Sequence, residues 1–105
     1  MVMHNPPHPG EFIREVYLDS FGLSARHLAM KIKVSPSTVA RILQGRSAVS
    51  PEMALRLSKA LGRSPESWLA MQDMHDLWCA RTSVNLDGIE RMQFDEPNNG
   101  MHPTR

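Results

Sequence analysis

Apolar side chains recur at helical spacing through most of this chain, most clearly between residues 24 and 46. They fall into two groups, each on one face of a short helix: Leu28, Ala29 and Ile32, then Val39, Ile42 and Leu43. The spacing predicts one helix over 25–32, a tight turn, and a second helix that ends before Gly45. We therefore expect two short helices that pack against each other.

Residues typical of helix ends flank this pair. Ser24 and Ser35 stand at the N-cap positions, and Pro36 takes the first helical position, where its missing N–H costs nothing. Gly45 permits the left-handed conformation after the last turn. The outward positions of the second helix are short, polar or cationic: Ser37, Thr38, Ala40, Arg41 and Gln44. Such a face suits a helix in the major groove of DNA, whereas a hairpin in another small bundle would simply solvate it.

Three further helices are predicted around the pair. Apolar residues predict a first helix from Pro9 to about Asp19. The pairs Ser50-Pro51 and Ser64-Pro65 repeat the start signal and predict helices over about 51–61 and 65–81. The inward residues of the fourth helix are then Met53, Ala54, Leu57, Ala60 and Leu61. The predicted fold is all-α: a compact five-helix bundle with a lambda-repressor-like helix-turn-helix, plus flexible termini.

The sequence divides into an arm, a domain and an extension. Residues 1–8, rich in proline, predict a flexible arm, and residues 9–81 form the DNA-binding domain, with its helix pair over about 25–44. In the extension, 82–105, four apolar residues fit a short helical turn or a partner-binding segment: Val84, Leu86, Ile89 and Met92. After residue 95 the sequence loses periodicity and is expected to be disordered.

The charges are unevenly distributed along the chain. The net charge is +1, but residues 23–63 carry +7, residues 1–22 carry −2, and residues 64–105 carry −4. A basic centre that coincides with the helical pair favours a polyanion as partner, and the acidic flanks offer surface to other proteins.

Other function classes find little support in the sequence. Cys79 is the only cysteine, which excludes an internal disulfide and suits a reducing cytoplasm, and neither a signal peptide nor a membrane span is predicted. No catalytic or phosphate-binding motif is present, and we expect no metal or cofactor. His4 and His8 have a metal-ligand spacing, but the prolines between them prevent a helix. His75 has Asp73 and Asp76 nearby and is the only candidate for acid–base chemistry.

Several short stretches together resemble one family. They are His8-Pro-Gly-Glu11, Val34-Ser-Pro-Ser-Thr-Val39, Ile42-Leu43-Gln-Gly45, Met53-Ala-Leu-Arg-Leu57 and Trp68-Leu-Ala-Met-Gln72. With them the chain resembles the HigA-type antitoxins, Xre/Cro-like helix-turn-helix proteins of bacterial toxin–antitoxin modules. Lys33 departs from the pattern, because helix-turn-helix turns often have glycine there. A positive φ at this position costs about 1 kcal/mol for a residue other than glycine. The lysine side chain also adds a positive charge near the expected phosphate.

The resemblance implies a dimer that represses its own operon at an operator and neutralises a HigB-type toxin, an mRNA-cleaving ribonuclease. The alternative within the class is a stand-alone Xre-family repressor without a toxin. A small enzyme that uses His75 and a pure protein-interaction bundle are the alternatives from other classes.

The predicted DNA contacts follow from the positions on the second helix of the pair. Arg41 is the best candidate for a bidentate contact to guanine, and Ser37 and Thr38 are expected at base edges or nearby phosphate. Pro36 and Ala40 are placed near thymine methyl groups. Four residues are expected to position the phosphate backbone: Lys33, Ser35, Gln44 and Arg46.

The last predicted helix carries more bulky residues than one buried face needs. We predict a two-fold homodimer through Trp68, Leu69, Met71, Leu77 and Trp78, and hence a palindromic operator. The alternative is that both tryptophans belong to the core. A toxin would then bind elsewhere, at the C-terminal segment or at an acidic surface made by Glu11, Glu15 and Asp19.

Overall fold

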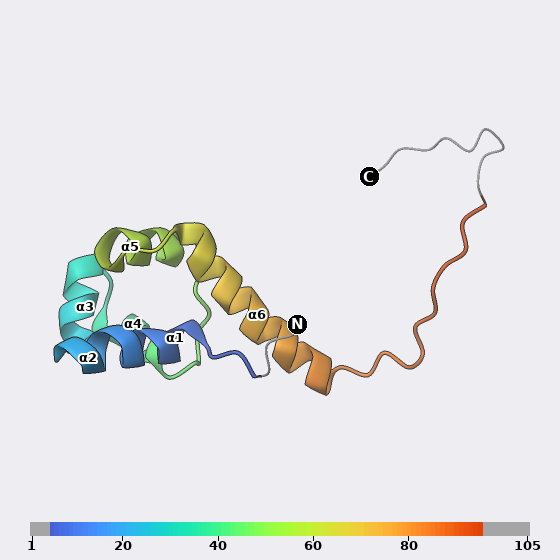
Figure 1. Cartoon of the computed structure of the whole chain (residues 1–105), viewed down its shortest axis with the longest axis horizontal. Helices are drawn as coiled ribbons and strands as arrows, with labels where there is room; N and C mark the ends of the chain where they lie inside the picture. The colour runs from blue at the N-terminus through green and yellow to red at the C-terminus, as the bar shows by residue number, and fades with distance from the viewer. Residues whose placement is uncertain (1–4, 96–105) are drawn as a thin grey trace.

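The computed structural model describes residues 5–95 as an all-helical protein (Figure 1). Within that range the structure contains no strand, which confirms the all-α prediction. The first helix is a continuous run of three pieces: α1 (Pro9–Phe12), the π-helical η1 (Ile13–Leu18) and α2 (Asp19–Phe21). The other helices are α3 (Ala25–Ile32), α4 (Pro36–Leu43), α5 (Pro51–Leu61) and α6 (Pro65–Ser83). The first and last helices each end two residues beyond the predicted position.

Serine N-caps set the starts of four helices, as predicted. The side-chain oxygens of Ser24, Ser35, Ser50 and Ser64 each accept a hydrogen bond from the backbone N–H three residues on. Three of the caps precede a proline at the first helical position. Because each cap satisfies a backbone N–H that has no partner within the helix, these starts are encoded locally.

The turns after α3 and α4 have the same hydrogen-bond pattern. Lys33 adopts φ 64°, and the N–H of Val34 donates to Ala29 O at 3.1 Å. Gly45 adopts φ 75°, and the N–H of Arg46 donates to Arg41 O at 2.8 Å. Both turns are therefore Schellman motifs with a left-handed residue after the helix, and Lys33 has the strained conformation that the sequence predicted.

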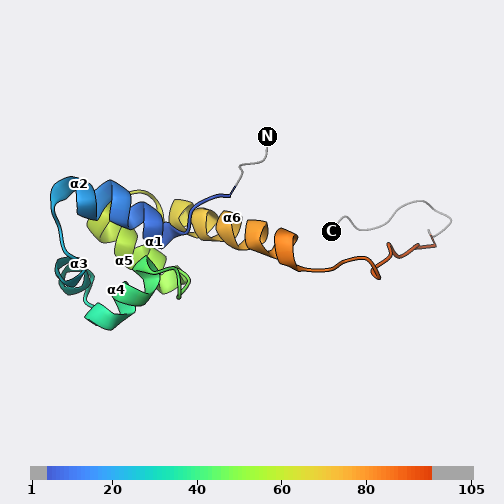
Figure 2. The same cartoon turned by 90° about the horizontal axis from the view of Figure 1, so that it is seen from below.

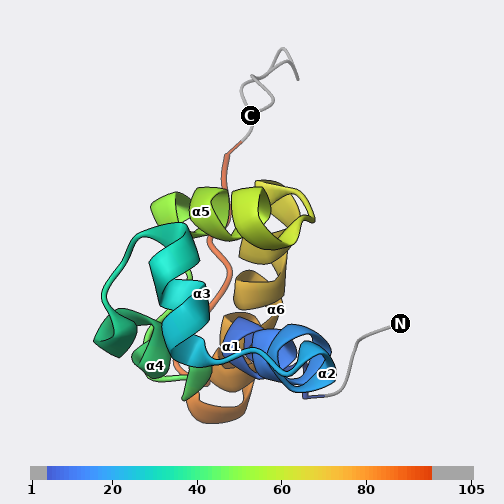
Figure 3. The same cartoon turned by 90° about the vertical axis from the view of Figure 1, so that its left-hand side faces the viewer.

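The core lies where the first helix, α3, α4, α5 and the start of α6 meet. Its buried residues include every inward position predicted for α3 and for the first two turns of α5, together with Val49 and Trp68. Ala60 is exposed, so its predicted inward position was wrong. In Figure 3, α3 stands between α5 on one side and the first helix on the other, and it contacts both α4 and α5.

The N-terminal arm is ordered from residue 5, which corrects the prediction of a flexible arm for 5–8. Pro6 and His8 are buried, and His75 Nδ1 lies 2.9 Å from Pro6 O. The His8 Nδ1 atom accepts the N–H of Gly10 at 2.8 Å and caps α1. The earlier part of the predicted arm, including His4, lies outside the described residues.

The molecule as a whole is elongated, because a C-terminal extension projects from the five-helix bundle. Its radius of gyration is 19.2 Å, against about 13 Å for a compact domain of this length. The end of α6 and residues 84–95 extend away from the other helices, as Figure 1 shows. Among the described residues, no helix combines the length and the apolar character needed to cross a bilayer.

Candidate nucleic-acid interface

Helices α3 and α4 form the predicted helix-turn-helix at one end of the molecule (Figure 2). Val39 and Ile42 anchor α4 in the core, and Leu43 is half-buried beside them. The opposite side of α4 presents Pro36, Ser37, Arg41 and the following Gln44 to solvent. The outward face expected from the sequence is therefore available for a large ligand.

The start of α4 carries a cluster of three hydroxyl groups. Ser35 Oγ accepts the N–H of Thr38 at 3.2 Å and lies 3.1 Å from Ser37 Oγ and 2.8 Å from Thr38 Oγ1. These bonds orient the hydroxyl groups before any ligand arrives. Short hydroxyl side chains at a helix N-terminus are well suited to hydrogen bonds with phosphate or base edges.

Three exposed cations surround this face: Lys33 in the turn, Arg41 on α4 and Arg46 after it. None of them has a carboxylate partner, since the single ion pair among residues 5–95 joins Glu52 to Arg56. Cations that are free of internal partners can neutralise phosphates or bind guanine. Thr38 and Ala40, also assigned to DNA, are half-buried and present only part of their surface.

Two arginines that the sequence analysis did not assign to the site hold the helical pair in position. Arg56 Nη1 donates to Ile32 O at 2.7 Å, while Glu52 Oε2 accepts Arg56 Nε at 3.1 Å and Nη2 at 2.8 Å. Arg14 Nη1 donates to Leu43 O at 2.8 Å. Each arginine thus bonds the C-terminal carbonyl of one helix of the pair. The spacing of Glu52 and Arg56 was a readable signal for their ion pair, but their contact with α3 was not.

A buried glutamine fixes the loop after α4. Gln72 of α6 accepts the N–H of Val49 at 2.8 Å through Oε1 and donates through Nε2 to Asp76 at 3.0 Å. Gln72 is only 4% exposed, so its amide has a structural role. The Trp-Leu-Ala-Met-Gln stretch therefore connects α6 to the loop that carries Arg46.

The first helix meets α4 in a backbone contact that only glycine allows. A Cβ atom at Gly10 would overlap the carbonyl oxygen of Ile42. The His8 side chain caps the same helix turn, and its ring lies next to Gly45 in the turn after α4. The His-Pro-Gly-Glu stretch thus places α1 against the end of α4, which gives that signature a physical reason.

Trp68 does not belong to the predicted dimer face. It is completely buried, and its Nε1 donates to Gly62 O at 3.1 Å. Leu69 and Met71 are partly buried against the core, Trp78 is half-buried, and Leu77 is half-exposed. Packing within one chain thus buries one of the two tryptophans of the predicted face.

His75, the residue of the enzyme alternative, lies against the N-terminal arm. Its ring contacts the Pro6 carbonyl through Nδ1, and Nε2 lies 3.6 Å from Cys79 Sγ. Among residues 5–95 no group of three or more metal-ligating side chains is assembled. The contacts of His75 in this structure join α6 to the arm.

Comparisons with known proteins agree with this architecture. The helix-turn-helix family model matches residues 13–68. An uncharacterised helix-turn-helix transcriptional regulator of Escherichia coli, YddM, is 39% identical over 92 residues, covering 88% of this chain and 97% of its own. Antitoxin HigA-1 of Vibrio cholerae is 34% identical over 92 residues, covering 88% and 83%. The structure of antitoxin GraA in complex with its operator superimposes with a TM-score of 0.78 at 38% identity, over 90% of this chain and 97% of that one.

The chain therefore belongs to the helix-turn-helix family of DNA-binding regulators. Its relatives and structural neighbours include the HigA-type antitoxins, which confirms the resemblance seen in the sequence. The family binds DNA and is not enzymatic, so the enzyme interpretation of His75 is not supported.

Proposed function

We propose that this chain is a dimeric antitoxin that represses its own operon at a palindromic operator and neutralises a HigB-type ribonuclease toxin. The observation that carries the proposal is the exposed face of α4, with Arg41 at its centre and no internal partner for that arginine. The similarity to GraA supports the same use of this face, since that antitoxin was solved with its operator.

In the proposed complex α4 enters the major groove. Arg41 makes a bidentate contact to guanine, and Ser37 and Thr38 contact base edges or the nearest phosphate. Pro36 and Ala40 lie near thymine methyl groups. Four residues fix the register through the phosphate backbone: Lys33, Ser35, Gln44 and Arg46.

A promoter–reporter fusion tests the repressor half of the proposal. The DNA upstream of the chain's own gene drives the reporter, and the chain is supplied from a second plasmid. Wild-type protein should lower reporter output, and Arg41→Ala should restore it while Arg81→Ala, an exposed arginine at the end of α6, should not. Equal repression by wild type and Arg41→Ala would remove α4 as the reading helix.

Two acidic surfaces are available for a basic toxin. Glu11, Glu15 and Asp19 are exposed along the first helix, and Asp87 and Glu90 are exposed in the C-terminal segment. Co-expression of the chain with the protein of the adjacent reading frame should restore growth and allow their co-purification. Glu15→Lys should weaken the complex and Glu66→Lys should not. A neighbour that is not toxic would favour the stand-alone repressor.

Without Trp68, the proposed dimer face consists of Leu69, Met71, Leu77 and Trp78. Leu77 is 50% exposed, a large apolar surface for a residue in mid-helix. Sedimentation of wild type, Leu77→Asp and the control Met30→Asp tests the face, because Met30 is an exposed apolar residue of α3. Wild type and the control should be dimers at tens of micromolar, and Leu77→Asp should dissociate more readily than either. A wild-type monomer would contradict the proposal.

A further inference from the structure

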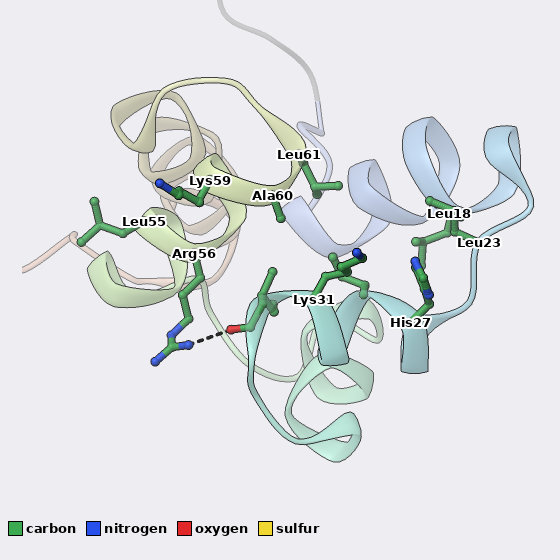
Figure 4. A pocket seen from close by; sticks show the side chains of 11 residues that line it. Leu18, Leu23, His27, Lys31, Leu55, Arg56, Lys59, Ala60 and Leu61 are labelled. Atoms are coloured by element: carbon green, nitrogen blue, oxygen red, sulfur yellow. Dashed lines mark hydrogen bonds between the residues drawn. The ribbon is translucent and has the colours of Figure 1, made fainter.

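A groove with an apolar floor lies between α3, α5 and the end of the first helix (Figure 4). Its volume is about 670 Å³, within the range of known binding clefts of roughly 300–1,000 Å³. Leu18, Leu28 and Ile32 form the floor, while Leu23 and Leu55 at the edges are 40% and 61% exposed. No lining residue belongs to α4, so the groove is separate from the proposed DNA-reading face.

The rim of this groove is positively charged. Lys31 of α3 and Lys59 of α5 are exposed and have no carboxylate partner among the described residues, and His27 also lines the groove, one helical turn before Lys31. Arg56 also lines the groove, but its guanidinium is bound by Glu52 and by the Ile32 carbonyl; the dashed line in Figure 4 marks the bond to Ile32. The groove therefore suits an apolar segment that carries carboxylates, and its charge disfavours a basic toxin.

The C-terminal segment 84–95 of this chain has that chemistry. Five large apolar side chains in it are more than half exposed: Val84, Leu86, Ile89, Met92 and Phe94. Asp87, Glu90 and Asp95 outnumber the single cation Arg91, so the segment has a net charge of −2. Exposed apolar residues in such a run usually mark a surface that contacts another protein.

The segment cannot reach the groove of its own chain with its central residues. Helix α6 contains 19 residues and is therefore about 28 Å long, and it runs away from α3 in Figures 1 and 2. Leu86 and Ile89 follow Ser83 by only three and six residues, which span at most about 10 and 20 Å. The groove that these residues can fill must belong to another molecule.

We propose that residues 84–95 of one copy dock into the groove between α3 and α5 of a second copy. Leu86 and Ile89 cover the apolar floor, and Asp87 and Glu90 lie beside Lys31 and Lys59. The exchange is separate from operator binding, because α4 needs neither the groove nor the segment. It places Asp87 and Glu90 against the second copy and leaves the first helix as the acidic surface for a toxin.

Zero-length carbodiimide crosslinking of the full chain tests this docking, since it joins a lysine amine to a carboxylate only where the two are in contact. Equal amounts of unlabelled and heavy-nitrogen protein are mixed, and the joined peptides are read by mass spectrometry. Lys31 or Lys59 should be joined to Asp87 or Glu90 in pairs of mixed isotope. Lys33, which is exposed but outside the groove, serves as the internal reference and should yield at least tenfold fewer such pairs.

Leu55→Asp places a carboxylate in the groove, and it should reduce the mixed pairs at least tenfold. Met30→Asp, an equally exposed position on α3, should leave them unchanged. Ile89→Asp changes the segment instead and cannot disturb the core, so it replaces Leu55→Asp if that variant loses helicity. The proposal would be overturned if the crosslinked pairs contained one isotope only, or if Lys33 gave as many mixed pairs as Lys31 and Lys59. It would also be overturned if the yield were unchanged in both the groove variant and the segment variant.

Discussion

At the scale of single residues, the proposed DNA-reading face depends on cationic side chains that have no carboxylate partner among the described residues. Arg41 projects from α4 while Val39 and Ile42 of the same helix are buried. Its assignment came from periodicity alone, and the structure places it on the exposed face. Gly10 had no such signal, because the need for glycine arises only where α1 meets the Ile42 carbonyl.

Arg41→Ala should cost about 1–3 kcal/mol of binding free energy on the operator and much less on random DNA, because a bidentate guanine contact is lost. Fluorescence anisotropy with the two duplexes measures both values, and Arg81→Ala provides the control. Equal losses on both duplexes would mean that Arg41 contacts only phosphate.

Gly10→Ala should lower the free energy of unfolding by about 1–3 kcal/mol, since the new methyl group overlaps the Ile42 carbonyl oxygen. The overlap outweighs the gain of about 1 kcal/mol that alanine gives in a helix. Urea unfolding measures the change. Gly88→Ala is the control, with no atom near its new Cβ, and should unfold like wild type. A stabilised Gly10→Ala would show that α1 does not lie so close to α4.

At the scale of the elements, the helix starts could be read from the sequence because their serine caps and prolines act within three residues. The docking of the N-terminal arm could not be predicted from the sequence, because Pro6 and His75 are 69 residues apart and their contact depends on the finished fold. The burial of Trp68 and Gln72 likewise depends on where α6 crosses the core. His8, directly before Pro9, is also an N-cap, although the sequence analysis predicted only serine caps.

Lys33 offers a test of the turn between α3 and α4. Lys33→Gly should raise the free energy of unfolding by about 1 kcal/mol, because glycine removes the strain of φ 64°. It should also reduce the slope of log affinity against log salt by about one unit. Lys33→Ala is the matched control, which loses the charge but keeps the strain. Identical stabilities for the two variants would place the turn in a different conformation.

His8 should make stability depend on pH. Burial lowers its pKa below 6.5, and the neighbouring His75 lowers it further, against weaker opposite effects of Asp76, Ser47 and Glu11. The unfolded chain then binds more protons, so stability from neutral His8 is present above pH 6.5 and is lost as the pH falls through the folded-state pKa.

His8→Asn keeps an N-cap oxygen and removes the titration. Urea unfolding at a series of pH values below neutrality should therefore show a smaller loss of stability in His8→Asn than in wild type. Parallel curves for the two proteins would assign the pH dependence to other histidines.

At the scale of the whole molecule, the parts that are proposed to bind DNA and the parts that are proposed to bind a toxin have opposite net charges. The basic centre of the chain contains the proposed DNA-reading pair and the rim of the groove, while the first helix and residues 84–95 each carry a net negative charge. The net charge of +1 conceals this division. A protein arranged in this way can bind DNA through α4 and offer carboxylates to other proteins through the first helix or the C-terminal segment.

Salt-dependent operator binding tests the central claim most directly. The full chain is titrated against the duplex upstream of its own gene and against a shuffled duplex of the same composition, from about 50 to 200 mM salt. The account predicts tighter binding to the upstream duplex and a log–log slope of several units, which Arg46→Ala reduces by about one. A slope near zero, or equal affinity for both duplexes at every salt concentration, would contradict it.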